Sequence, residues 1–133
     1  MAVPTAQEVI LSFLAGLGDG GGDDEIGLDY TGPTTDTATQ MMVLPIELAA
    51  NENNQQFNLS THFDSLLYVI LVDTGNVGFK FAKVSGVSTS DKIKVAPGKF
   101  CVITETAAFT LYLDNLSAAS ASYGKIIAIG SSA

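Results

Sequence analysis

The run Leu66-Leu67-Tyr68-Val69-Ile70-Leu71-Val72 is the strongest indicator of the fold of this chain. The run is apolar throughout, and its β-branched and aromatic side chains favour a strand. Because successive residues of a strand point to opposite faces, such a run predicts a strand that is covered on both faces. The turn residues Asp73-Thr74-Gly75-Asn76 follow it directly and predict its end.

Around this run, apolar and polar residues alternate from residue 37 onward. Phe79-Lys80-Phe81-Ala82-Lys83-Val84 shows the alternation clearly, and a period of two is typical of strands with one buried face. Pro45 lacks a backbone N–H, so it places its strand at a sheet edge or a bulge. The expected strands cover residues 40–48, 56–61, 66–73, 77–84, 92–96, 99–105, 109–114 and 123–129. Their spacing predicts an all-β fold, with an antiparallel β-sandwich or jelly-roll-like domain over residues 37–133.

Residues 1–17 have a different period, of three to four residues, which predicts a short N-terminal helix. Thr5-Ala6-Gln7-Glu8 fits a capping box, with Thr5 as the cap and Glu8 three positions later. A helix this short is marginal alone in water, so we expect its apolar face to dock on a neighbour. That face comprises Val9, Ile10, Phe13, Leu14 and Leu17.

Residues 18–36 are expected to form an extended, acidic, glycine-rich arm. The arm begins with Gly18-Asp19-Gly20-Gly21-Gly22-Asp23-Asp24-Glu25, and so many glycines argue against regular structure. Residues 1–36 are thus one unit, helix plus arm, ahead of the sandwich. We expect the arm to lie against lysine-bearing surface of another copy. The residues concerned are Asp19, Asp23, Asp24 and Glu25 on the arm, and Lys80 and Lys83 on the sandwich.

Charge is divided unevenly along the chain. Residues 1–79 hold eleven carboxylates and no lysine, whereas all six lysines lie in residues 80–133 with three carboxylates. Such a split favours head-to-tail contact between copies. Charged residues make up only 15% of the chain, against roughly 25% in typical soluble domains, so we expect a homo-oligomer. A net charge of −8 without arginine disfavours nucleic-acid binding. No apolar run approaches the roughly 20 residues of a membrane span, so no membrane partner is expected.

The residues that usually carry catalysis or hold metals are scarce. His62 is the only histidine and Cys101 the only cysteine, so neither a zinc site nor a catalytic triad is indicated. The acids of the arm could hold calcium, although their spacing differs from an EF-hand loop. We therefore expect no enzyme activity, no cofactor and no bound metal. A carbohydrate- or calcium-binding β-sandwich module stays open as an alternative.

Three C-terminal segments share one pattern of short strands and small-residue turns: residues 93–103 with the central Ala96-Pro97-Gly98 turn, residues 109–116, and residues 123–130. Together they resemble the end of small β-sandwich structural proteins of tailed-phage virions. The resemblance extends over residues 66–130. It implies a non-enzymatic subunit, such as a head decoration (cement), head-completion or tail component. Its partners would be other copies of itself and other virion proteins, and it would be made in the host cytoplasm and reside in the virion.

Overall fold

The computed structural model describes residues 6–17, 26–32, 36–104 and 107–132, and for residues 13–17 and 26–30 it describes the backbone alone. Their regular secondary structure is nearly all strand, with one short 3-10 helix, η1 (Thr89–Asp91). Within those ranges, no helix has the length and apolarity that a membrane crossing requires.

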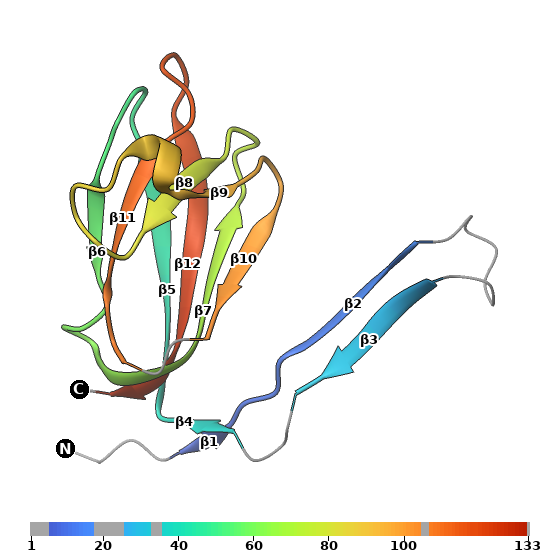
Figure 1. Cartoon of the computed structure of the whole chain (residues 1–133). Coiled ribbons are helices and arrows are strands. Elements are labelled where there is room, and N and C mark those ends of the chain that lie inside the picture. Colours follow the sequence, from blue (N-terminus) through green and yellow to red (C-terminus); the bar gives the residue numbers. More distant parts are fainter. Residues whose placement is uncertain (1–5, 18–25, 33–35, 105–106, 133) are drawn as a thin grey trace.

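Two four-stranded antiparallel sheets pack face to face and form the body of the molecule (Figure 1). The first, called the β12 sheet, has the order β10 (Phe100–Ile103), β7 (Phe63–Asp73), β12 (Ser122–Ser132) and β5 (Gln40–Leu48). The second, called the β11 sheet, has the order β6 (Gln55–Asn58), β11 (Thr110–Asn115), β8 (Phe79–Ala82) and β9 (Ile93–Val95). The predicted all-β sandwich is therefore confirmed.

Each of the eight strands expected from the period-two pattern is present. Pro45 lies in β5, which is an edge strand of the β12 sheet, as its missing N–H predicted. The core between the sheets is apolar and fully enclosed. It contains Phe63, Val69 and Leu71 from β7, Phe79 and Phe81 from β8, Leu111 and Leu113 from β11, and Ile126 and Ala128 from β12. Burial of these side chains is the main source of stability.

The outer face of β7 differs from the sequence prediction. The run 66–72 was expected to be covered on both faces, yet only alternate residues face the core. Leu71 and Val69 are fully buried, whereas Ile70 and Val72 are only half-buried on the opposite face. No second layer of the described residues covers this part of the outer face.

The predicted N-terminal helix is wrong. Gln7–Glu8 is strand β1 and pairs with β4 (Thr37–Ala38), and Ser12–Leu17 is strand β2 and pairs with β3 (Ile26–Thr31). The predicted cap, Thr5, lies outside the described residues. The helical spacing also contains an alternation, Phe13, Ala15 and Leu17, which a strand can use. Pairing with residues 26–31, which the local pattern does not reveal, satisfies the backbone of residues 12–17.

Strands β2 and β3 form a hairpin that extends away from the sandwich, and we call it the hairpin arm (Figure 1). Its base is attached to the end of the β12 sheet. The Thr39 N–H donates to the Gly130 carbonyl at 3.0 Å, and the Ser132 N–H donates to Thr39 Oγ1 at 2.9 Å. The Tyr68 hydroxyl donates to Asp36 Oδ2 at 2.9 Å. These bonds fix where the arm leaves the body.

A methyl group at Gly130 should destabilise the sandwich, because the paired strand β7 comes unusually close to β12 at the bulge there. A Cβ at Gly130 would collide with the Ser65 carbonyl oxygen and lie 2.9 Å from Leu66 Cα. We expect Gly130→Ala to lower the free energy of unfolding by about 1–3 kcal/mol. Denaturant titration followed by circular dichroism measures it. Ser131→Ala, the next residue of the same strand, serves as control and should stay within about 0.5 kcal/mol of wild type.

Candidate interaction surface

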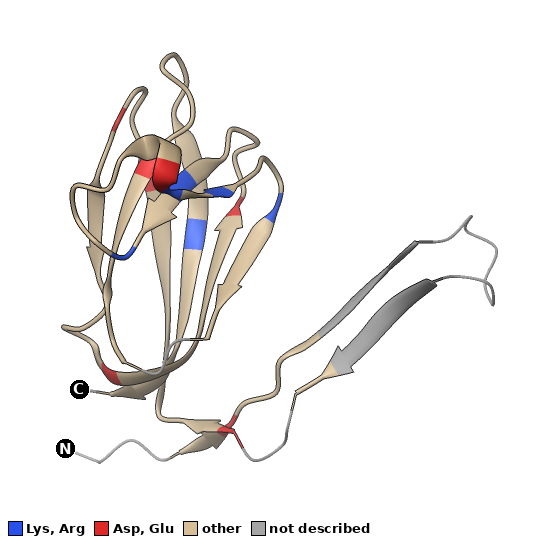
Figure 2. Cartoon of the chain, in the orientation of Figure 1, with Lys and Arg blue, Asp and Glu red and all other residues tan. Residues whose placement is uncertain are grey.

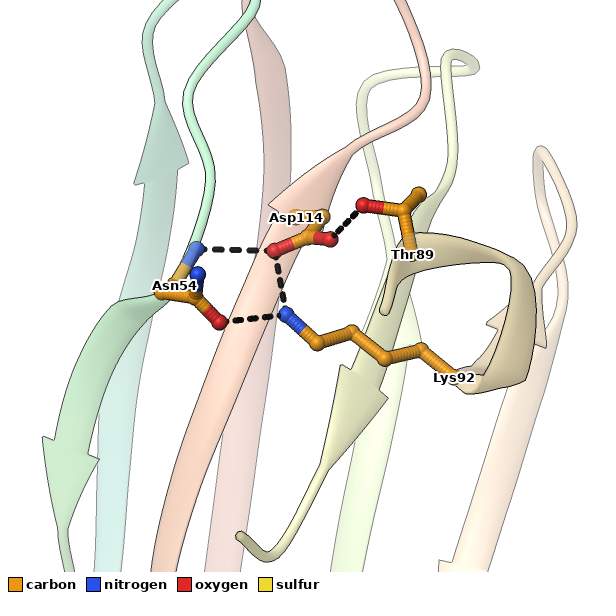
Figure 3. A network of polar contacts seen from close by, with 4 residues as sticks. All are labelled: Asn54, Thr89, Lys92 and Asp114. Carbon is orange, nitrogen blue, oxygen red and sulfur yellow. Dashed lines mark hydrogen bonds and ion pairs between the residues drawn. The ribbon is translucent and has the colours of Figure 1, made fainter. Parts of the chain in front are cut away.

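A buried polar network joins three segments of the β11 sheet (Figure 3). Lys92 Nζ donates to Asp114 Oδ1 at 2.5 Å and to Asn54 Oδ1 at 2.7 Å. The Asn54 N–H donates to Asp114 Oδ1 at 2.7 Å, and the Thr89 hydroxyl donates to Asp114 Oδ2 at 2.5 Å. The side chains of both Lys92 and Asp114 are almost completely inaccessible to solvent.

The network closes the outer face of the β11 sheet. Asp114 follows the core residue Leu113 and therefore points away from the core, beneath η1. Lys92, directly after η1, pairs with it and so holds the helix over the sheet (Figure 3). Burial raises the pKa of Asp114, but the hydrogen bonds from Lys92, Thr89 and Asn54 outweigh burial and hold the pKa below its ordinary value.

A third buried charge, Asp73, organises two turns. Its carboxylate accepts the N–H groups of Asn76 at 2.9 Å, Gly78 at 3.1 Å and Gly98 at 2.8 Å. The turn after β7 and the turn before β10 are thus tied to one side chain. In the described part of the chain, every buried side-chain N or O has a hydrogen-bond partner. The buried charges Asp73, Lys92 and Asp114 therefore act as structural groups.

The outer face of the β12 sheet has the opposite character and is almost entirely apolar. Strand register gives its outward positions as Phe100 and Val102 on β10; Tyr68, Ile70 and Val72 on β7; Tyr123, Lys125, Ile127 and Ile129 on β12; and Met41, Val43, Pro45 and Glu47 on β5. We call this set the apolar outer face. Met41 is 65% exposed, Val43 51% and Phe100 63%. Lys125 and Glu47 are its only charged positions, and Figure 2 shows how little charge these strands carry. Contiguous apolar surface of this kind marks interaction sites.

One end of the apolar outer face is already covered by the base of the arm. Tyr68 is only 9% exposed there, and its hydroxyl donates to Asp36 Oδ2. A cavity of about 360 Å³ lies between strand β1 and this end of the sheet. Val9 and Ile10, between β1 and β2, line it on one side, and Met41 and Ile129 line it from the sheet. The N-terminal segment and the apolar outer face therefore border the same hollow at this end of the sheet.

The predicted interaction residues are found in three places. Val9 and Ile10 come together at this cavity, and Phe13, Leu14 and Leu17 lie on β2. Lys80 lies on β8 opposite Lys94 of β9, and Lys83 Nζ lies 5.4 Å from the centre of the Phe109 ring. The acidic residues Asp19, Asp23, Asp24 and Glu25 lie outside the described residues, so their contact with Lys80 and Lys83 stays a prediction.

Two features were missed by sequence reasoning. The burial of Lys92 was not predicted, because it depends on Asp114 and Asn54, which are distant in sequence. The apolar outer face could have been found from the alternation Met41, Val43 and Pro45 in an edge strand, which leaves apolar residues on both faces of β5.

Cys101 and His62 provide no sign of a reactive centre. Cys101 lines a second cavity of about 460 Å³ between the edge strands β9 and β10, together with Val84, Ile93 and Ile103. Burial raises the pKa of the Cys101 thiol, which disfavours the reactive thiolate. His62 is exposed in the turn before β7. No group of three metal-ligating side chains occurs within the residues that the structure describes.

Removing one partner of the buried ion pair should be costly. Lys92→Met leaves the Asp114 carboxylate buried without its cation, so we expect the free energy of unfolding to fall by about 3–5 kcal/mol. Lys94→Met is the matched control, because Lys94 lies two residues further on, in β9, and is exposed, and it should change stability by about 0.5 kcal/mol or less. Urea titration measures both. A loss below about 1 kcal/mol in Lys92→Met would contradict the role given to the pair.

The same carboxylate should make the protein sensitive to acid. The pKa of Asp114 is lower in the folded state than in the unfolded state. Its contribution is therefore complete above the ordinary aspartate value of about 3.9 and is lost as the pH falls through the lower folded pKa. The free energy of unfolding of wild type, measured by urea titration from pH 7 to pH 2, should fall more steeply at acid pH than that of Asp114→Asn. Exposed Asp64→Asn should retain the steeper fall.

Comparison of the chain with protein-family models, with curated protein sequences and with solved structures found no match, so its function is inferred from its own residues and geometry.

Proposed function

We propose that this chain is a structural subunit of a virion that works by assembly, either with copies of itself or by decorating a capsid or tail, and that it performs no catalysis. The observation that carries the proposal is the combination of an apolar outer sheet face with a hairpin arm that extends away from the body. A freely diffusing monomer would gain nothing from either feature. A subunit needs both, since each offers a surface to a neighbour.

The strand pairing supports a jelly-roll architecture for the sandwich. The first of its eight strands pairs with the last, β5 with β12, and the second with the seventh, β6 with β11. The third pairs with the sixth, β7 with β10, and the fourth with the fifth, β8 with β9. This nested pairing in two sheets is the jelly-roll arrangement, which is used in viral capsid domains and in lectins.

The chemistry of the buried groups favours a structural role over a catalytic one. An enzyme site brings together titratable groups that are free to exchange protons with a substrate. Here Asp73 is occupied by three backbone N–H groups, and Asp114 by Lys92, Asn54 and Thr89. These side chains stabilise loops. The low charge of the chain also suits a protein whose surface is covered in an assembly.

Excision of the hairpin arm tests assembly directly. The Gly32 N–H donates to the Leu11 carbonyl at 2.6 Å, so residues 12–31 can be replaced by a short Gly-Ser linker while the base of the arm stays intact. We expect the wild-type chain to sediment as an oligomer and the excised variant as a folded monomer with the same far-ultraviolet spectrum. A monomeric wild type at high concentration would contradict self-assembly.

The assignment to a virion needs a separate measurement. We expect mass spectrometry of purified virus particles from the source of the gene to detect the chain at a stoichiometry comparable to other structural proteins. The lysate after particle removal serves as control. Absence from the particles, with abundance in that lysate, would contradict the proposal.

A further inference from the structure

We infer that the hairpin arm of one copy docks on the apolar outer face of a second copy, as a third layer on its β12 sheet. The inference rests on the proposed assembly function and names the two surfaces that would carry it. Both surfaces belong to this chain, so no other protein is required.

The register of the hairpin gives it one apolar face. Phe13 is opposite Tyr30, Ala15 is opposite Leu28 and Leu17 is opposite Ile26. Because residues alternate between faces along a strand, these three pairs share one face. The other face has the pairs Ser12 with Thr31, Leu14 with Asp29 and Gly16 with Gly27. Read in this register, the sequence is that of an amphipathic hairpin, with three apolar pairs at alternate positions.

The hairpin needs support from outside itself. A two-stranded hairpin is at best marginally stable alone in water, and a third layer or further strands must bury its apolar side. Its own sandwich does not provide that support in the described structure, because the arm extends away from the body (Figure 1). The Val9 N–H donates to the Asp36 carbonyl at 2.8 Å, and the Gly32 N–H donates to the Leu11 carbonyl. These two bonds link the pairing of β1 with β4 to the pairing of β2 with β3. A second copy can place its sheet there.

The apolar outer face matches the hairpin in chemistry and in size. Strands of six residues span about 20 Å, and a sheet packs on another at a distance of about 10 Å. Strands β7 and β12 each have eleven residues, which is ample length for such a hairpin. Ile70 and Val72 are apolar residues on the open side of β7. A docked hairpin would provide the second cover that the sequence of β7 indicates.

The contact would begin beside a hollow that the chain already borders. Val9, Ile10, Met41 and Ile129 line this hollow at one end of the same face. From there a neighbour's hairpin would cover the face toward Val43 and Phe100, which are exposed. Since one copy donates its arm and another its sheet, the contact is heterologous and generates a ring or a filament.

Charged substitutions on the apolar outer face test the docking. Val43→Glu and Phe100→Glu place a charge at exposed positions, so the sandwich should fold normally. Burial of a charge in the interface should weaken self-association at least tenfold, measured by analytical ultracentrifugation. Val84→Glu is the matched control, because Val84 is 65% exposed but lies outside this face, and it should associate like wild type. Circular dichroism and thermal melting verify the fold of each variant.

A mixing experiment then identifies the two surfaces as partners. The arm variant Phe13→Glu/Leu28→Glu retains an intact sheet face, and the face variant Val43→Glu/Phe100→Glu retains an intact arm. Each should be monomeric alone, and an equimolar mixture should form a one-to-one dimer that goes no further. Wild type mixed with either variant should give shorter assemblies than wild type alone.

Two results would overturn the docking and are distinct from failure of the proposed function. If wild type associates and both face variants associate equally well, assembly uses another surface and the docking site is wrong. If the two monomeric variants stay monomeric when mixed, the arm and the face are not each other's partners. A wild type that is monomeric at every concentration would contradict self-assembly as well.

Discussion

The pairing of β12 with β5 on one side and β7 on the other is the interaction on which the rest of the molecule depends. It joins the beginning and the end of the sandwich in one sheet, and it places Ile126 and Ala128 at the centre of the core. Close approach of the strands requires glycine at Gly130, where a Cβ would meet the Ser65 carbonyl. The base of the arm is bonded to the same end of β12 through Thr39. The positions of the core, the apolar outer face and the arm therefore all depend on β12.

The outer faces of the two sheets differ in polarity and in cover, and this difference is the main indication of function in the structure. The β11 sheet is closed by its own chain, with η1 held down by the Lys92–Asp114 pair. The β12 sheet is left apolar over most of its width, and only its end is covered, by the base of the arm. Buried charge therefore completes the fold on one side, and apolar surface stays exposed on the other. The proposed assembly function would account for this division.

Much of the fold could be predicted from sequence because the sandwich has local signals. Alternation, together with the apolar run 66–72, located all eight strands, and Pro45 indicated an edge or a bulge for β5, which is an edge strand. The N-terminal segment could not be predicted, because Val9, Ile10, Phe13, Leu14 and Leu17 fit a helix locally, and the choice of a strand depends on pairing with residues 26–31. Lys92 was missed for a similar reason: burial of a charge depends on a partner from a distant strand. Exposure of Met41 and Val43 follows from β5 being an edge strand with apolar residues at alternating outward positions.

The nested strand order has a consequence for how the chain folds. Gln40 pairs with Gly130 and Leu48 with Ser122, so the β12 sheet cannot be completed before residues 122–130 have been synthesised. A topology dominated by such distant pairs has a high contact order and folds slowly. Until β12 arrives, the apolar residues of β5 and β7 have open strand edges beside them, which is when β proteins aggregate. Folding yield should therefore fall with rising expression rate, and slow synthesis at low temperature should favour the native sandwich.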